Sequence, residues 1–158
     1  MLTVAAALAV GVGSAMAAEG TASGTIAYKG QTLTVKHAYL LKGPDVVDKD
    51  TIVSRLVLTP KDIGKALAAC TTMMCAQGEV EDGFSIDMAA GPRFGYWVGL
   101  KGGKVQYSGT TKPAALAATT EQPDRLAGKL GIDDVASGGP RIEVQFDAPL
   151  LKEVKAAF

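Results

Sequence analysis

The chain has 158 residues, with 16 Lys and Arg against 16 Asp and Glu, so its formal net charge at pH 7 is zero. This balance argues against a nucleic-acid-binding surface and against a polybasic membrane patch, because both require clustered positive charge. Hydrophobic residues make up 47% and 19 residues are Gly, which favours short strands and many turns over a helical bundle.

Residues 1–17 are typical of a secretory signal peptide. An apolar run covers residues 2–12, and small residues stand at Ala15 and Ala17, the two positions that a signal peptidase reads. No basic residue precedes the run, which departs from the usual pattern. We expect cleavage after Ala17, a periplasmic or secreted location and one β-rich domain over residues 18–158. No later segment is apolar enough to span a membrane, so we expect no integral membrane segment after signal removal.

The next segments predict a hairpin and a central strand. Residues 24–28 and 32–41 flank a Lys29-Gly30 turn. Residues 51–58 are apolar on both faces apart from Ser54 and Arg55, which favours a central position in a sheet. In the second strand of the hairpin, period-two alternation predicts that one set of side chains points inward: Leu33, Val35, His37, Tyr39 and Leu41.

A helical pattern follows. Thr59 is the expected N-cap and Pro60 the first helical residue. Gln77-Gly78 is the expected stop. Between these limits, residues at helical spacing predict one amphipathic helix: Ile63, Ala66, Leu67, Cys70 and Met74.

The second half of the chain reads as short strands and turns. In residues 141–148 the inward face is Ile142, Val144, Phe146 and Ala148. The expected strands are 84–88, 93–101, 104–108, 125–133 and 141–148, and the connection 109–124 holds at most one helical turn, within 113–118. We therefore predict a mainly β fold: an antiparallel β-sandwich or flattened barrel of about seven or eight strands with one inserted α-helix.

Two segments carry a resemblance. The first is Ser23-Gly24-Thr25-Ile26, the turn at Gly30 and Thr34-Val35-Lys36-His37-Ala38-Tyr39; the second is Leu126-Ala127-Gly128-Lys129-Leu130 with Val144-Gln145-Phe146-Asp147-Ala148-Pro149. They resemble the opening and closing hairpins of uncharacterised secreted bacterial proteins. The resemblance covers the first and last thirds of the chain, whereas the middle third departs from it. It implies export and a β-rich fold, and it implies no chemistry.

The two cysteines, Cys70 and Cys75, are expected to form a disulfide in an oxidising compartment. Residues five apart on a continuous helix lie too far apart and on different faces for a bridge. A disulfide therefore requires the helix to end or unwind between them.

Three residues are candidate binding residues: His37, Tyr39 and Trp97. His37 is the only histidine, and the alternative for it is a half-buried side chain bonded to its neighbours. Trp97 lies between Gly95 and Gly99, where small neighbours leave its ring open to a ligand; the alternative is an indole packed in a second layer.

The sulfur-rich stretch from Cys70 to Cys75 also contains Met73 and Met74. Thiolates and thioethers are the ligands that cuprous copper prefers, so a periplasmic copper or redox site that includes His37 is one alternative. The other is a disulfide with two core methionines, because Met fills irregular gaps well.

No motif for catalysis is present in the sequence: there is no nucleophile elbow, no Ser-x-x-Lys, no phosphate loop and no dinucleotide fingerprint. We expect a non-catalytic binding or structural module with no cofactor, whose partner is a small molecule or an envelope protein. A hydrolase with a carboxylate pair that the sequence does not mark is a further alternative. Two acidic runs, Asp45, Asp48, Asp50 and Glu79, Glu81, Asp82, lack the EF-hand pattern and are interpreted as solvated loops.

Overall fold

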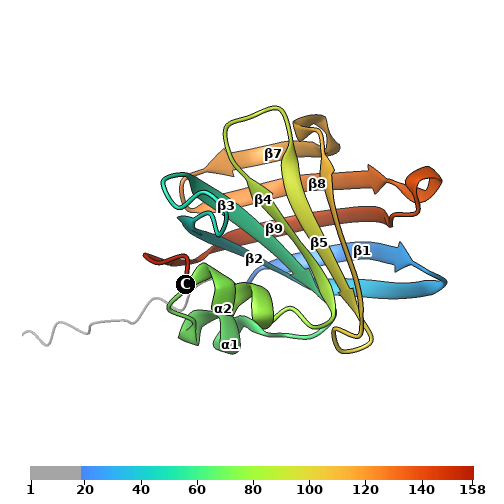
Figure 1. Cartoon of the computed structure of the whole chain (residues 1–158), viewed down its shortest axis with the longest axis horizontal. Coiled ribbons are helices and arrows are strands. Elements are labelled where there is room, and N and C mark those ends of the chain that lie inside the picture. Colours follow the sequence, from blue (N-terminus) through green and yellow to red (C-terminus); the bar gives the residue numbers. More distant parts are fainter. Residues whose placement is uncertain (1–18) are drawn as a thin grey trace, which may run out of the picture.

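The computed structural model describes residues 19–158 and shows one nine-stranded sheet that curls into a half-barrel (Figure 1). The strand order is β6-β5-β4-β3-β2-β1-β9-β8-β7, and neighbouring strands are antiparallel except for an added parallel pairing of β2 with β9. The predicted signal peptide, residues 1–17, lies outside the described residues. The strands are β1 (Thr21–Tyr28), β2 (Gln31–Pro44), β3 (Ile52–Thr59), β4 (Gly83–Met88), β5 (Phe94–Leu100), β6 (Val105–Thr111), β7 (Leu116–Gln122), β8 (Arg125–Asp133) and β9 (Arg141–Glu153).

The predicted mainly β, antiparallel class is confirmed, with one curled sheet and one strand more than expected. The additional strand is β7, which lies inside the segment predicted as a connection. A short 3₁₀ turn, η1 (Pro113–Ala115), precedes it, and β7 is held by its pairing with β8. The alanines and threonines of β7 are mostly exposed on both sides, so no alternation marked the strand in the sequence.

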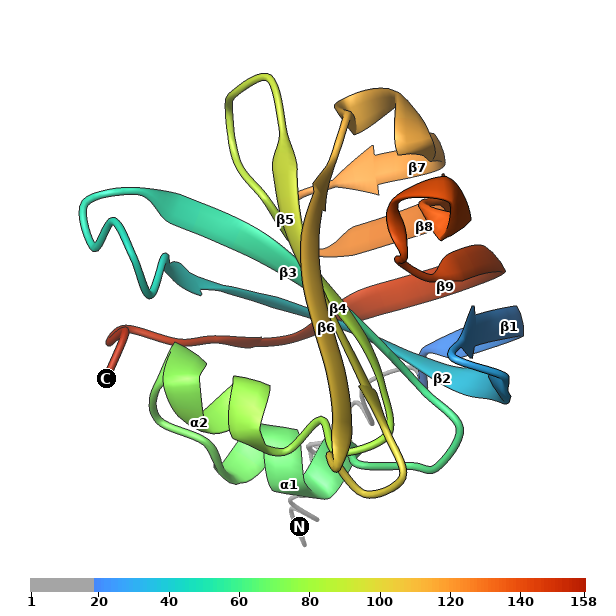
Figure 2. The same cartoon turned by 45° about the vertical axis from the view of Figure 1, so that its right-hand side comes forward.

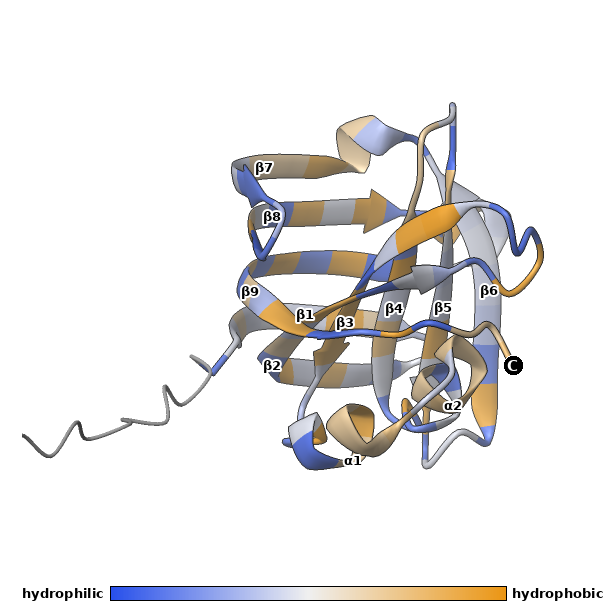
Figure 3. Ribbon diagram, turned by 90° about the vertical axis from the view of Figure 1, so that its left-hand side faces the viewer, coloured by the Kyte–Doolittle hydropathy of each residue, from blue (hydrophilic) through white to orange (hydrophobic). Residues whose placement is uncertain are grey.

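The concave face of the sheet holds the main hydrophobic core. Strands from both halves contribute, including Ile26, Leu56, Phe84, Tyr96 and Ile142, all of which are fully buried. The predicted alternation of β9 is confirmed, because its residues from 141 to 148 alternate between the core and water. Figure 3 shows this alternation as bands of opposite hydropathy along β8 and β9.

The predicted inward face of β2 is wrong beyond Val35. Val35 packs in the concave core, but so does Ala38, whereas Tyr39 and Leu41 belong to a second cluster on the convex face. The pairing of β1 with β2 shifts register at this point, because an advance of three residues along β1, from Gly24 to Thr21, matches an advance of two along β2, from Val35 to His37. Such a shift marks an irregularity in the pairing, and the β2 side chains change face there. His37 therefore lies on the convex side with Tyr39 and Leu41, and not with Leu33 and Val35.

The chain forms two short helices, and not one, after β3 and before β4: α1 (Gly64–Ala69) and α2 (Met73–Gly78). They cover part of the convex face of the sheet (Figure 2). The predicted helix start at Thr59 and Pro60 is wrong, because Thr59 ends β3 and α1 begins at Gly64. The predicted helix is also interrupted at residues 70–72. Thr72 caps α2, its hydroxyl accepting a hydrogen bond from the Cys75 N–H at 3.0 Å. No helix among residues 19–158 has both the length and the apolar character that crossing a membrane requires.

The break between the helices allows the disulfide. Cys70 and Cys75 are bonded, with a Cα–Cα separation of 5.6 Å. Cys70 follows α1 in extended conformation and Cys75 lies within α2. The condition derived from the sequence, that the helix must end between the cysteines, is confirmed.

Candidate functional site

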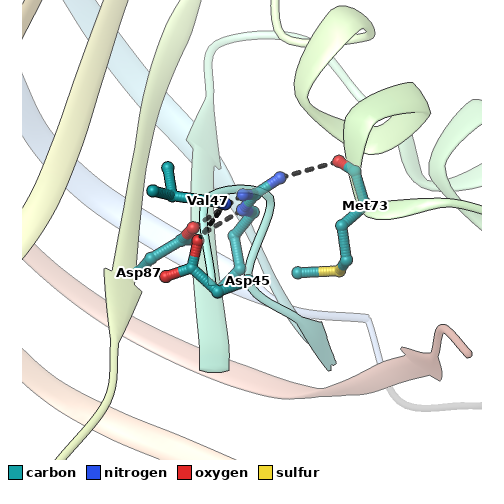
Figure 4. A network of polar contacts seen from close by, with 5 residues as sticks. Asp45, Val47, Met73 and Asp87 are labelled. Carbon is teal, nitrogen blue, oxygen red and sulfur yellow. Dashed lines mark hydrogen bonds and ion pairs between the residues drawn. The ribbon is translucent and has the colours of Figure 1, made fainter. Parts of the chain in front are cut away.

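A buried ion pair lies beneath the helices on the convex face. Arg55 of β3 stands directly opposite Asp87 of β4. Arg55 Nε and Nη2 donate to the two carboxylate oxygens of Asp87 at 2.6 and 2.7 Å, and Nη1 donates to the Met73 carbonyl oxygen at 2.8 Å (Figure 4). The side chains are 0% and 6% exposed. This two-pronged geometry satisfies both charges away from water and ties the sheet to the start of α2.

Trp97 of β5 lies beside this pair. Its ring centroid is 5.8 Å from Arg55 Cζ, within the range of a cation–π contact. The ring reaches over Gly95, where a Cβ would stand 3.5 Å from Trp97 Cη2. A Cβ on Gly99 would stand 2.7 Å from the Glu81 carbonyl oxygen. The two glycines therefore make room for different neighbours, one for the indole and the other for the chain that follows α2.

A pocket of about 390 Å³ opens next to Trp97, between the end of α2 and the convex face of β4–β6. No Asp, Glu, Lys, Arg or His among the described residues lines it. The Oε1 atom of Gln77 is buried at this wall and has no hydrogen-bond partner among residues 19–158. The pocket is lined by Gln77, Val80, Ser85, Trp97, Val98, Gly99, Gln106, Tyr107 and Ser108.

His37 and Tyr39 lie in a different pocket, of about 160 Å³, beside the start of α1. Their rings stack with centroids 6.5 Å apart. The Tyr39 hydroxyl donates to Asp62 Oδ1 at 2.7 Å and accepts from the Ile63 N–H at 2.9 Å. Burial, together with the bond to Asp62, raises the pKa of Tyr39 to about 12. The Gly64 N–H and the Tyr39 hydroxyl hold the pKa of the Asp62 carboxyl below its usual value.

The structure thus divides the three candidate binding residues between two pockets. The hydroxyl of Tyr39 is already engaged on both sides, as donor and as acceptor, and the pocket that it shares with His37 is the smaller one. Trp97 alone adjoins a hollow within the size range usual for small-molecule sites.

The sulfur atoms do not converge on one point. Met73 is fully buried against Val53 and Val154, whereas Met74 is 41% exposed. Cys70 and Cys75 lie near Glu79, but both sulfurs are joined in the disulfide and carry no thiolate for a metal. In this oxidised form the cluster packs and staples the helices.

A third hollow, of about 480 Å³, lies where the concave face opens at one end of the half-barrel. Its walls are largely aliphatic and aromatic side chains of the main core, among them Leu40, Met88, Phe94 and Leu116. Lys42, the cation at its rim, is hydrogen-bonded to the Pro123 carbonyl oxygen. Polar side chains also line this mouth, and Lys42 and Glu121 give it charge of both signs.

Three side chains of the acidic runs accept hydrogen bonds from nearby turns. Asp45 accepts the Val47 N–H at 2.6 Å, and Asp48 accepts the Thr51 hydroxyl at 2.6 Å. Asp82 accepts the Gly102 N–H at 3.1 Å. These bonds stabilise turns.

Sequence reasoning singled out Trp97 and its glycines but missed the Arg55–Asp87 pair. The available signal was a single charge within each of two consecutive, otherwise uncharged strands, residues 52–59 and 83–88. Opposite charges in such strands are stable only when they meet.

The chain matches no protein-family model, no curated protein and no solved structure at a significant level. The resemblance to secreted bacterial proteins therefore stays a prediction. What remains for function is the chemistry of the pockets themselves. The pocket beside Trp97 presents hydroxyls, amides and an indole; such groups bind and orient a ligand, and they include no general base or acid suited to neutral pH.

Proposed function

We propose that this chain is an exported, non-catalytic binding module that takes up a small molecule in the pocket beside Trp97. The observation that carries the proposal is a hollow of about 390 Å³ with an indole on one side and several neutral polar side chains around it. Small-molecule sites combine apolar or aromatic surface with a few placed polar groups in this way.

The setting of the pocket supports a binding role. Its floor is β4, β5 and the edge strand β6, and Gln77 of α2 forms part of its wall. α2 is held from below by the Arg55 bond to Met73 and from the side by the disulfide. A site whose walls are fixed before binding loses less conformational entropy on binding.

Export is supported by the leader-like residues 1–17 and by the disulfide, which is typical of oxidising compartments. Native mass spectrometry, without reductant, of the protein purified from whole cells tests this part. We expect the mass of residues 18–158 with one disulfide. A chain that retains Met1 and carries two free thiols would contradict export.

Binding is tested with the fluorescence of Trp97, which is the only tryptophan of the chain. Three classes of probe are titrated: neutral hexoses, glucuronate and decanoate. We expect at least one class to give a saturable change with a Kd below about 1 mM. Ser108→Tyr, at an exposed position that lines the pocket, should abolish the change by filling the hollow.

The matched control is Thr25→Tyr, an exposed and regularly paired position of β1. It adds a ring of the same size outside the pocket and should leave the titration unchanged. If no class of probe binds, or if Ser108→Tyr leaves binding intact, the pocket is not the site and the proposed function is wrong.

A further inference from the structure

The walls of the Trp97 pocket carry no net charge. Arg55, the charged group beside the Trp97 ring, is neutralised by Asp87, and both side chains are all but inaccessible to water. A charged ligand would have to leave water without a counter-charge, which is costly. The pocket therefore disfavours both anions and cations.

The polar groups that line the pocket are amides and hydroxyls. Gln77 and Gln106 each carry a donor and an acceptor, and Ser85 and Ser108 each carry a hydroxyl that acts as both. The Oε1 atom of the Gln77 amide has no hydrogen-bond partner among residues 19–158. Rotation about its broad terminal torsion brings either amide atom toward the hollow. A wholly apolar ligand would cover these groups and leave them unpaired, at a free-energy cost.

Trp97 supplies a flat apolar wall next to these groups. Arg55 lies near its ring, and Gly95 leaves room for the ring beside the sheet. An indole provides a large contact area with little conformational freedom to lose. A ligand that suits both walls has one apolar face of C–H groups and a rim of groups that both donate and accept hydrogen bonds.

From these three observations we infer that the ligand is an uncharged, hydroxyl-rich ring compound, that is, a neutral sugar or short oligosaccharide, stacked on Trp97 and hydrogen-bonded by Gln77 and Gln106. This inference rests on the proposed function and specifies the ligand of the same pocket. The ring of such a ligand offers C–H faces to the indole, and its hydroxyls match the amides in donating and accepting.

The test compares probes that differ in charge. Glucose, galactose, mannose and N-acetylglucosamine are titrated, each as the free sugar and as a disaccharide, beside glucuronate, which differs from glucose by a carboxylate. We expect at least one neutral sugar to saturate the change in Trp97 fluorescence, and glucuronate to bind at least about tenfold more weakly than glucose. Decanoate should not bind in the pocket. Any change in Trp97 fluorescence that it causes should therefore persist in the Ser108→Tyr variant.

The second arm uses Gln77→Leu, with Gln145→Leu on the exposed side of β9 as its control. Gln77→Leu removes an amide whose oxygen is already unsatisfied, so the fold should be unaffected or slightly stabilised. Affinity for the sugar should fall about five- to tenfold, the equivalent of one net hydrogen bond. Gln145→Leu should change neither quantity. A Trp97→Ala variant, followed by calorimetry because it lacks the fluorophore, should lose binding.

The outcomes separate the two proposals. If glucuronate or decanoate binds in the pocket and the neutral sugars do not, the inference about ligand class is overturned and the proposed function stands. If sugars bind but Gln77→Leu has no effect on affinity, the assigned polar contact is wrong. If no probe binds, the proposed function fails with the inference.

Discussion

The convex face of the sheet has two regions. Each contains an Arg–Asp ion pair, exposed to water in one region and buried in the other. Over β8 and β9 it faces water, and Arg125 pairs there with Asp147, the two side chains being 51% and 39% exposed. Over β3 and β4 it is covered by the helices, and Arg55 pairs with Asp87 at almost no exposure. The exposed pair contributes little to the stability of the fold. In the covered pair, loss of either partner would leave a buried charge without its counter-charge. The pocket lies beside the covered pair, so the cover creates the site.

The largest expected effect comes from breaking the covered pair. Arg55→Ala leaves the Asp87 carboxylate buried without its partner and should lower the free energy of unfolding by about 3–5 kcal/mol. The measurement is urea unfolding followed by far-UV circular dichroism, because Trp97 fluorescence would respond to the loss of its neighbour as well as to unfolding.

Arg125→Ala is the matched control, since Arg125 makes a similar two-pronged pair with Asp147 in water. It should cost less than about 1 kcal/mol. The double variant Arg55→Met, Asp87→Leu should recover most of the loss, because apolar side chains of similar volume replace both charges. Equal losses for Arg55→Ala and Arg125→Ala would show that the cover does not matter.

The uncovered region depends on its backbone more than on its charges. In β8, Gly128 has a φ of 159°, and a Cβ there would stand 2.3 Å from the Ala117 carbonyl oxygen of β7. Gly128→Ala must therefore shift the edge strand, and we expect a loss of up to about 3 kcal/mol in the free energy of unfolding.

Gly131, three residues along the same strand, sharpens this expectation. A Cβ there would meet no atom within 4 Å, so Gly131→Ala should be neutral or slightly stabilising, by less than about 1 kcal/mol. Thermal unfolding of the two variants side by side gives the comparison. A Gly128→Ala protein as stable as the wild type would mean that β7 is not held against β8 as described.

The same division between covered and uncovered strands explains how much of the fold could be predicted from the sequence. In β9, one face lies in the core and the other in water, so alternation placed its residues correctly. In β3 and β4 both faces are buried, so alternation carried no information about Arg55 and Asp87. The phase change in β2 coincides with the register shift in its pairing with β1. Periodicity within one segment cannot reveal a register set by another strand.

The candidate site was predictable only in part. The sequence singled out Trp97 because it stands between two glycines, and in β5 its ring reaches over Gly95. Gln77 and Gln106 gave no signal, because each is an ordinary polar residue within its own segment. They meet at the pocket through the packing of α2 on β4–β6. The break in the predicted helix could be predicted, because a disulfide between the two cysteines requires the helix to end between them.

The disulfide holds the cover together, and its removal should have an intermediate effect. Cys70→Ala with Cys75→Ala opens a very short loop, for which chain-entropy arguments give a loss of about 2 kcal/mol. Urea unfolding measures it, and reduction of the wild-type protein should give a similar change. The bonds of Arg55 to Met73 and of the Met73 N–H to Ala156 remain to hold α2, so the native fold should persist. Complete unfolding of the double variant would show that these bonds are not sufficient.

The last prediction concerns Tyr39, which joins β2 to the start of α1 and makes stability depend on pH in the alkaline range. The pKa of Tyr39 is raised from 10.0 to about 12 by burial and by its bond to Asp62. The folded protein therefore holds this proton more tightly than the unfolded chain does. The corresponding stability is fully present below pH 10 and is lost as the pH rises to about 12.

Tyr39→Phe removes the titrating group and isolates its contribution. The variant should show a constant difference from wild type at neutral pH, where two hydrogen bonds are missing, and a shallower decline in stability between pH 10 and 12. The pKa of Tyr96 is also raised, by burial and by Asp134, so part of the decline remains in both proteins. Parallel stability curves for wild type and variant across this range would mean that the Tyr39 hydroxyl ionises as freely in the fold as in the unfolded chain, and that the contact between β2 and α1 is open to water.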